Sequence, residues 1–331
     1  MTAIRPTVPF DADGTHHGFL RLPHSRNDSA WGSVMIPITV IRNGAGPTAL
    51  FTGANHGDEY EGPIALQSLA LEIAPEAVTG RVILVPYMNF PAFRAGTRVS
   101  PIDGVNLNRA FPGRADGSVT QKIAQYFNDV LLPMADVVLD FHSGGRTLDF
   151  LPFACAHYLD DPAQQAACVA AARAFAAPYT LMLREIDSVG MYDTAVEAQG
   201  KVFVTTELGG GGTATARSAR IARRGARNLL IHAGILAGEP EPGDSVLLDM
   251  PDDDCYHVAT SDGLLEPLVD LGEAVAEGAP LARIWPSDRT GLAPRVHTAQ
   301  RAGLLAARHF PGLIQTGDCL AVIASANPEG R

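Results

Sequence analysis

The sequence predicts an α/β fold in which a mostly parallel sheet is flanked by helices and followed by a smaller C-terminal β domain. The first observation is that short apolar segments alternate with helix-like segments between residues 48 and 237. Strands connected through helices pair in parallel, and the helices cover both faces of the sheet. The second observation is a weak, glycine-rich internal repeat after residue 255, which is typical of short strands joined by turns.

Four apolar segments are predicted as buried strands of this sheet. Each is short and rich in Val, Ile and Leu, as strands covered on both faces are. An extended segment at 34–41 precedes them within a β-rich N-terminal region. The four strands are expected at 48–53, 81–87, 136–141 and 201–208.

The helices between these strands are predicted from the residues at their ends. Ser118 with Gln121 three residues later forms a capping-box pattern, and Asp161 is a typical N-cap residue. Pro63 suits the first position of a helix. The helices are expected at 63–74, 118–132, 161–177 and 214–237.

A change of composition near Glu239 predicts two domains. The segment GEPEPGD reads as a linker, and the segments 263–284 and 303–323 that follow resemble each other. We therefore expect an α/β domain over 1–240, including the β-rich segment 1–48, and a small β domain over 241–331. The repeat resembles barrel-sandwich hybrids of the biotinyl/lipoyl type.

Composition limits the classes of partner. The chain has 331 residues, is 46% hydrophobic and carries a formal net charge of −11, which disfavours nucleic acid as a partner. The N-terminus has no apolar signal-peptide core, and no apolar run is long enough to span a membrane. Four scattered cysteines fit reduced thiols in the cytoplasm. Assembly into a homo-oligomer is left open.

Metal-binding side chains follow three of the predicted strands. His56 and Glu59 follow the first, His142 the third and Glu207 the fourth. In open α/β sheets, ligands bind beyond the carboxyl ends of the strands, so these residues are expected to meet. Two histidines and a glutamate are a standard ligand set for one catalytic Zn²⁺ with an open position. The sequence therefore predicts a zinc site at this edge.

The remaining acids near these strand ends suit supporting roles. Glu207 is suited to act as the general base that takes a proton from water. Asp140, two residues before His142, is expected to orient that ligand, and Asp58 either orients a ligand or places charge at a helix N-terminus. The HEXXH motif is absent, so a thermolysin-like protease is not indicated.

A loop at 93–113, rich in Pro, Gly and Asn, carries Arg94, Arg98 and Arg109 in an otherwise acidic chain. One arginine can hold a substrate carboxylate with two hydrogen bonds, and a second can polarise a carbonyl. Surface salt bridges that tether the loop are the alternative interpretation.

Four motifs give the chain a family resemblance. NHGDE (55–59), NLNR (106–109), DFHSGG (140–145) and TTELGG (205–210) occur in the order seen in the succinylglutamate desuccinylase/aspartoacylase family. That family is similar in fold to zinc carboxypeptidases, and the resemblance covers about residues 30–240. It implies a zinc-dependent acylase.

The resemblance also implies roles for residues of the arginine-bearing loop. Arg98 would polarise the scissile carbonyl, while Asn108 and Arg109 would bind the α-carboxylate of the substrate. The stretch between the two arginines is longer here than in aspartoacylases, so Arg94 is a rival for the role of Arg98.

Within the family, the segments 17–40, 92–113 and 205–218 resemble deacetylases that act on N-acetyl-L-2,4-diaminobutyrate in bacterial ectoine breakdown. Such a substrate carries a free side-chain ammonium, for which Asp187, Asp193 and Glu197 are candidate partners. One alternative is an aspartoacylase or succinylglutamate desuccinylase type of activity on an acidic N-acyl amino acid. Others are a carboxypeptidase and a non-catalytic module that binds zinc or carboxylates.

Overall fold

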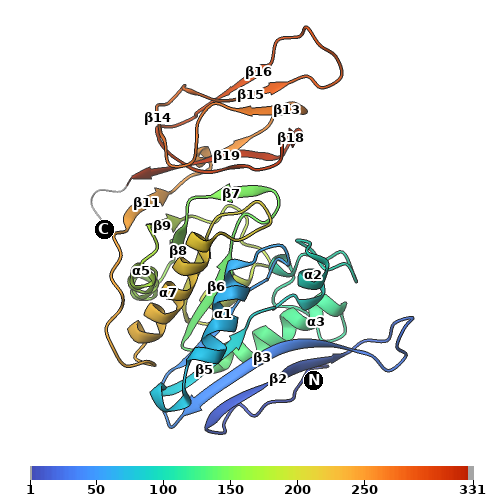
Figure 1. Ribbon diagram of the computed structural model, residues 1–331, viewed down its shortest axis with the longest axis vertical. Coiled ribbons are helices and arrows are strands. Elements are labelled where there is room, and N and C mark those ends of the chain that lie inside the picture. Colours follow the sequence, from blue (N-terminus) through green and yellow to red (C-terminus); the bar gives the residue numbers. More distant parts are fainter. Residues whose placement is uncertain (1, 327–331) are drawn as a thin grey trace.

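The computed structural model describes residues 2–326, which form an α/β layer with a β unit at one end (Figure 1). The main sheet has 15 strands. Its strands are β1 (Arg5–Pro6), β2 (Gly14–Pro23), β3 (Ser33–Asn43), β4 (Thr48–Thr52), β5 (Gly80–Val85), β6 (Val137–His142), β7 (Leu148–Phe150), β8 (Phe153–His157), β9 (Tyr179–Leu183), β10 (Val202–Glu207), β11 (Val246–Met250), β12 (Tyr256–Val258), β14 (Ala274–Val275), β17 (Gly303–His309) and β19 (Cys319–Ala326).

The pairing order of the main sheet is β1-β2-β3-β5-β4-β6-β10-β8-β9-β11-β19-β17-β14. The strands β5, β4, β6 and β10 at its centre are parallel. A second, four-stranded sheet has the order β16-β15-β13-β18. Its strands are β13 (Gly263–Pro267), β15 (Pro280–Trp285), β16 (Arg295–Thr298) and β18 (Leu313–Ile314).

Helices cover both faces of the parallel strands. On one face Phe141 of β6 packs edge-on against Phe175, and on the other Phe203 of β10 packs against Tyr192. The helices are α1 (Glu61–Glu72), α2 (Phe90–Ala95), α3 (Val119–Tyr126), α4 (Leu132–Met134), α5 (Pro162–Phe175), α6 (Tyr192–Glu197), α7 (Ala216–His232), η1 (Pro75–Ala77), η2 (Leu107–Arg109), η3 (Phe127–Leu131) and η4 (Asp253–Cys255).

The predicted strands and helix starts are confirmed to within two residues, whereas the helix expected over 214–237 already ends at His232. The four predicted strands are β4, β5, β6 and β10, each within a residue or two of its expected bounds. The capping box forms, because the Ser118 hydroxyl accepts from the backbone of Gln121 and the Gln121 side chain accepts from the backbone of Ser118. Asp161 caps α5. Helix α1 begins at Glu61, two residues before Pro63.

Both halves of the internal repeat fold in the same way, as a strand, a two-residue strand and a second strand. They comprise β13, β14 and β15 in the first half, and β17, β18 and β19 in the second. The short strand of each half pairs with the first strand of the other, since β14 pairs with β17 and β18 with β13. The two halves therefore interlock through backbone hydrogen bonds.

The C-terminal β unit also continues the main sheet. β11 pairs with β9 on one side and β19 on the other, and β7 pairs with β17 (Figure 1). Strands from both ends of the chain thus share one hydrogen-bonded sheet. Among residues 2–326, no helix has the length and apolar character needed to cross a bilayer.

Candidate active site

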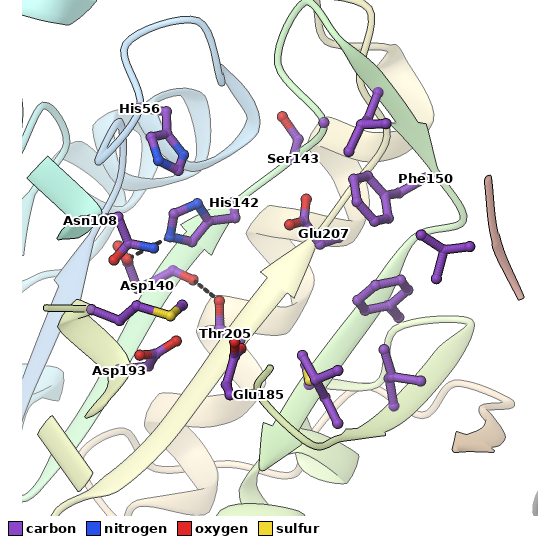
Figure 2. Close-up of a pocket in the computed structure, with 18 of the residues that line it drawn as sticks. His56, Asn108, Asp140, His142, Ser143, Phe150, Glu185, Asp193, Thr205 and Glu207 are labelled. Atoms are coloured by element: carbon purple, nitrogen blue, oxygen red, sulfur yellow. Dashed lines mark hydrogen bonds and ion pairs between the residues drawn. The ribbon is translucent and has the colours of Figure 1, made fainter. Parts of the chain in front are cut away.

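Three neighbouring parallel strands bring the predicted metal ligands and base to one edge of the sheet. β6 lies between β4 and β10, so the carboxyl ends of these strands meet. His142 ends β6 and Glu207 ends β10, while the loop after β4 carries His56 and Glu59. Figure 2 shows His56, His142 and Glu207 around one cavity.

Gly57 lets the loop that carries His56 and Glu59 lie directly against α2. The backbone N–H of Gly57 donates to the carbonyl of Thr97 at 3.0 Å. A Cβ atom added to Gly57 would lie 2.0 Å from the carbonyl carbon of Ala92. The approach of these two backbones therefore requires glycine at this position.

The two histidines face opposite oxygens of one carboxylate. His56 Nδ1 lies 2.8 Å from Glu59 Oε1, and His142 Nδ1 lies 3.0 Å from Glu59 Oε2. The two imidazole centroids are 5.0 Å apart. His56 and Glu59 are buried, and His142 is nearly so. The three ligand atoms thus converge on a small buried volume.

Hydrogen bonds on the far side of each ring fix which nitrogen faces Glu59. His56 Nε2 lies 3.2 Å from the amide oxygen of Asn106, and His142 Nε2 lies 2.8 Å from a carboxylate oxygen of Asp140. Both partners are acceptors, so they orient the Nε2–H groups and leave Nδ1 as the nitrogen that faces Glu59. Either a proton on Nδ1 or a metal cation can join each imidazole to the carboxylate, and the ligand types fit Zn²⁺.

Burial and mutual interactions shift the pKa values of all three side chains in this cluster. Burial lowers the pKa of His56 and favours its neutral ring. Burial tends to raise the pKa of Glu59, but the two histidines outweigh it and hold that pKa below its ordinary value. Burial tends to lower the pKa of His142, but Asp140 and Glu59 raise it well above its ordinary value. Glu59 is therefore ionised at neutral pH, as a ligand carboxylate must be.

The two acids expected to support the ligands occupy different places. Asp140 is buried and contacts His142 directly, and it also accepts from Thr52 Oγ1 at 2.6 Å and Asn55 Nδ2 at 3.0 Å. Asp58 instead accepts from the backbone N–H of Arg146 at 2.9 Å. Asp140 can thus orient a ligand, whereas Asp58 fixes the loop after β6.

Glu207 lines the cavity next to the cluster. Within residues 2–326, its buried Oε2 atom has no hydrogen-bond partner. Burial and the charge of Glu59 raise the pKa of Glu207 to about 8, against the opposing effect of His142 and Arg98. A cation held by the cluster would lower this pKa and favour the carboxylate, which is the form that accepts a proton.

The three arginines of the 93–113 loop differ in whether they reach the cavity. Arg98 lines the cavity, and its guanidinium lies 3.6 Å from Glu59 Oε1. Arg109 also lines the cavity, whereas Arg94 is exposed and lies outside the lining residues. His56, Glu59 and His142 are called the metal cluster below. The geometry favours Arg98 over Arg94 as the group beside it.

Asn108 is buried beside Arg109 and is held on both sides. Its side-chain oxygen accepts from the backbone N–H of Tyr192 at 3.0 Å and from Asn55 Nδ2 at 3.2 Å. The backbone oxygen of Asn108 accepts from Arg109 Nη1 at 2.8 Å. The amide nitrogen of Asn108 is a donor, which is the group that a substrate carboxylate needs.

The three candidate ammonium partners are also separated. Asp193 is buried and lines the cavity, Glu197 lies 2.8 Å from His157 Nδ1, and Asp187 is exposed and outside the cavity. The structure adds His157 and Glu185, which line the cavity and were not predicted. Their signal in the sequence was the short apolar segment FACAH, now β8, which ends in His157.

The cavity has a volume of about 370 Å³ and two kinds of wall. The polar wall comes from the ends of the parallel strands and from the arginine loop. Part of the apolar wall comes from residues beyond 240, namely Met250, Tyr256, Ala306, Cys319 and Val322. The C-terminal strands therefore shape the same cavity that the metal cluster occupies.

This fold and this site define a hydrolase of N-acyl amino acids with a candidate metal site in its cavity. Residues 45–233 match the family model of the succinylglutamate desuccinylase/aspartoacylase catalytic domain. The chain belongs to this family, whose members hydrolyse N-acyl amino acids.

Several relatives cover nearly the whole chain. The N-alpha-acetyl-L-2,4-diaminobutyric acid deacetylase of Halomonas elongata is 56% identical over 97% of this chain and 94% of its own length. The product-bound structure of the ectoine utilization protein EutE (DoeB) from Ruegeria pomeroyi has a TM-score of 0.97 at 65% identity, covering 98% and 99% of the two chains. A succinylglutamate desuccinylase structure from Silicibacter has a TM-score of 0.96 at 66% identity, covering 99% of each chain.

Proposed function

We propose that the protein is a zinc-dependent amidohydrolase that releases acetate from N2-acetyl-L-2,4-diaminobutyrate during ectoine breakdown. The observation that carries the proposal is the convergence of His56, Glu59 and His142 beside the unpartnered Glu207 in one cavity. The choice of substrate is supported by the similarity to a diaminobutyric acid deacetylase and to an ectoine utilization protein.

One Zn²⁺ would be held by the Nδ1 atoms of His56 and His142 and by the carboxylate of Glu59. This set leaves a coordination position open, as catalytic zinc sites do. Zinc supplies Lewis-acid activation of water and of the acyl carbonyl. Asp140 and Asn106 keep the two rings in the required tautomer through their hydrogen bonds to Nε2.

Glu207 moves the proton that the reaction requires. Its carboxylate takes a proton from water as the water oxygen bonds to the acyl carbon. The same carboxyl group then delivers that proton to the amide nitrogen as the C–N bond breaks, giving acetate and a free amine. A buried, unpartnered oxygen suits this role, because no hydrogen bond has to be broken first.

Two arginines would bind the substrate at different places, the acyl carbonyl and the α-carboxylate. Arg98, beside Glu59, would stabilise the negative charge that develops on the carbonyl oxygen. Arg109 and the Asn108 amide would hold the α-carboxylate, which places the acetamide against Glu207.

We propose that residues 1–240 carry the chemistry and that 241–331 close the apolar side of the cavity. The lining residues beyond 240 support this division. We also infer that the protein acts in the cytoplasm, because Cys155, Cys168, Cys255 and Cys319 are all free thiols.

Release of the free amino acid from each substrate by zinc-loaded protein tests the function. N2-acetyl-L-2,4-diaminobutyrate should be hydrolysed faster than N-acetyl-aspartate and N-succinyl-glutamate, and chelation of the metal should stop turnover until zinc is restored. Full activity in metal-free protein would contradict the mechanism. Faster turnover of N-acetyl-aspartate or N-succinyl-glutamate would contradict the assigned substrate but not the mechanism.

A further inference from the structure

A second group of titratable side chains lines the cavity apart from the metal cluster. His157 ends β8, Glu185 follows β9, and Asp193 lies in the first turn of α6. One side-chain ligand atom from each of these residues lies within 4.8 Å of the others. Figure 2 shows Glu185 and Asp193 at the opposite end of the view from His56.

His157 is buried and makes only half of the hydrogen bonds that its ring can make. Nδ1 lies 2.8 Å from Glu197 Oε1, which fixes the ring. Within residues 2–326, the buried Nε2 atom has no hydrogen-bond partner, and Glu185 Oε1 lies 3.5 Å from it. His157 is 3% exposed, so this nitrogen can gain a partner only from inside the cavity.

The charges of this group are unbalanced. The carboxylates of Glu185, Asp193 and Glu197 surround a single imidazole, so two negative charges remain even when His157 is protonated. Burial raises the pKa of Glu185, His157 lowers it, and Asp193 raises it, with a net increase. The charge of Arg109 also lowers the pKa of Glu185, but the proposed function assigns Arg109 to the substrate's carboxylate. A cation from the ligand would balance these charges.

We propose that His157, Glu185 and Asp193 form the subsite that binds the side-chain ammonium of the substrate. An ammonium group has three N–H donors, and the subsite offers two carboxylates and, once the ammonium takes the place of the proton on His157, the Nε2 lone pair of its imidazole. Acceptors that share one ammonium nitrogen at about 2.9 Å can lie up to about 4.7 Å apart, which suits the observed spacing. Three acids were expected from the sequence to bind the ammonium, Asp187, Asp193 and Glu197. In this subsite Asp193 alone of these would contact it directly.

This inference rests on the proposed deacetylase function and makes it more specific. A substrate with a neutral side chain of the same shape would leave the acids unbalanced, and a dicarboxylate would be repelled. The subsite therefore determines which N-acetyl amino acids react, while the metal cluster and Glu207 determine how they react.

The test compares two substrates that differ only in charge. N2-acetyl-L-2,4-diaminobutyrate and N-acetyl-L-norvaline have side chains of nearly equal size, ending in ammonium and methyl respectively. We expect kcat/KM to favour the diaminobutyrate substrate in the wild type. Glu185→Gln and Asp193→Asn should each reduce that preference by about 10- to 100-fold, the worth of a hydrogen bond to a charged group.

Asp187→Asn is the matched control, since Asp187 is an exposed acid two residues from Glu185. It should leave the preference unchanged. If Glu185→Gln and Asp193→Asn lower kcat/KM equally for both substrates, the subsite is overturned, because a purely structural role would affect the two substrates alike. A wild type that hydrolyses both substrates equally well would also overturn it, although the deacetylase would stand.

Metal content separates the ammonium subsite from a second metal site. Zinc per chain should be the same in the wild type and in Glu185→Gln. A wild type with two zinc ions and a variant with one would overturn the proposal. If the wild type hydrolyses neither substrate, the proposed function itself fails, so the two failures are distinguishable.

Discussion

Replacing Gly57 with alanine should displace two of the three proposed metal ligands without altering the ligands themselves. Gly57 lies between His56 and Glu59 and packs on the backbone of α2. A Cβ atom would lie 2.0 Å from the carbonyl carbon of Ala92 and 2.2 Å from the backbone nitrogen of Phe93. Both neighbours are backbone atoms, so neither can rotate away.

The size of the effect follows from these contacts. An ordinary Cβ contact begins near 3.4 Å, so the loop and α2 must separate by about 1.4 Å. A displacement of about 1 Å at a catalytic group can lower the rate about 100-fold. Overpacking of this kind also lowers the free energy of unfolding by about 1–3 kcal/mol.

Three measurements on Gly57→Ala check this reasoning: zinc per chain after dialysis, kcat/KM for acetate release, and urea unfolding. We expect reduced zinc retention, about 100-fold lower kcat/KM and a modest loss of stability. Gly312→Ala is the control, because a Cβ at Gly312 would meet nothing within 4 Å. Wild-type zinc retention and activity in Gly57→Ala would refute the argument.

The remaining predictions concern the base, the carboxylate site and a buried histidine. Glu207→Gln should keep its zinc and lose about 10²–10⁴ in kcat, measured by acetate release, because the amide cannot take a proton. Arg109→Lys should lower kcat/KM, because an ammonium cannot bind a carboxylate as the guanidinium fork does. His257 Nε2 accepts from the backbone of Gln300 at 2.8 Å, and burial lowers the pKa of His257. Its contribution to stability should therefore decrease as the pH falls below 6.5, measured by urea unfolding of the wild type and His257→Gln.

Each of these predictions has an outcome that contradicts it. Loss of zinc from Glu207→Gln would make Glu207 a metal ligand instead of a base. If Arg109→Lys prefers the substrate with a free α-carboxylate over the α-amidated substrate as strongly as the wild type does, Arg109 does not bind the α-carboxylate. For His257, the same loss of stability at low pH in His257→Gln would show that other groups cause it.

The strands and the metal cluster could be predicted because their signals are local. His56, His142 and Glu207 each follow an apolar segment directly, and parallel strands bring such positions to one edge. The capping residues Ser118 and Asp161 marked helix starts for the same reason, since a cap acts within three residues.

His157 and Glu185 could not be predicted in the same way. They meet because β8 and β9 pair in parallel with His157 opposite Leu183, and Glu185 follows two residues later. β8 also runs antiparallel to β10, which departs from the expected alternation of strands and helices. Pairing between distant segments depends on the whole fold, and a five-residue strand has no periodic signal of its own.

The continuation of the sheet into the C-terminal unit was unpredictable for a related reason. A repeat indicates how its two halves pair with each other, but it carries no information about an outside partner. The pairing of Phe150 with Ala307 joins segments more than 150 residues apart, and neither segment has a distinctive pattern. Composition indicated a linker near Glu239, yet hydrogen bonds cross from one side of it to the other.

The shared cavity wall has a consequence for how such enzymes can diverge. In the proposed mechanism hydrolysis depends on groups before residue 240, whereas Tyr256, Cys319 and Val322 border the cavity that would hold the substrate. Substitutions in these C-terminal strands can change the shape of that space while the ligands of the metal and the base remain intact. Natural selection, or a directed-evolution experiment, can therefore explore new substrates in one segment without rebuilding the reaction encoded in the other.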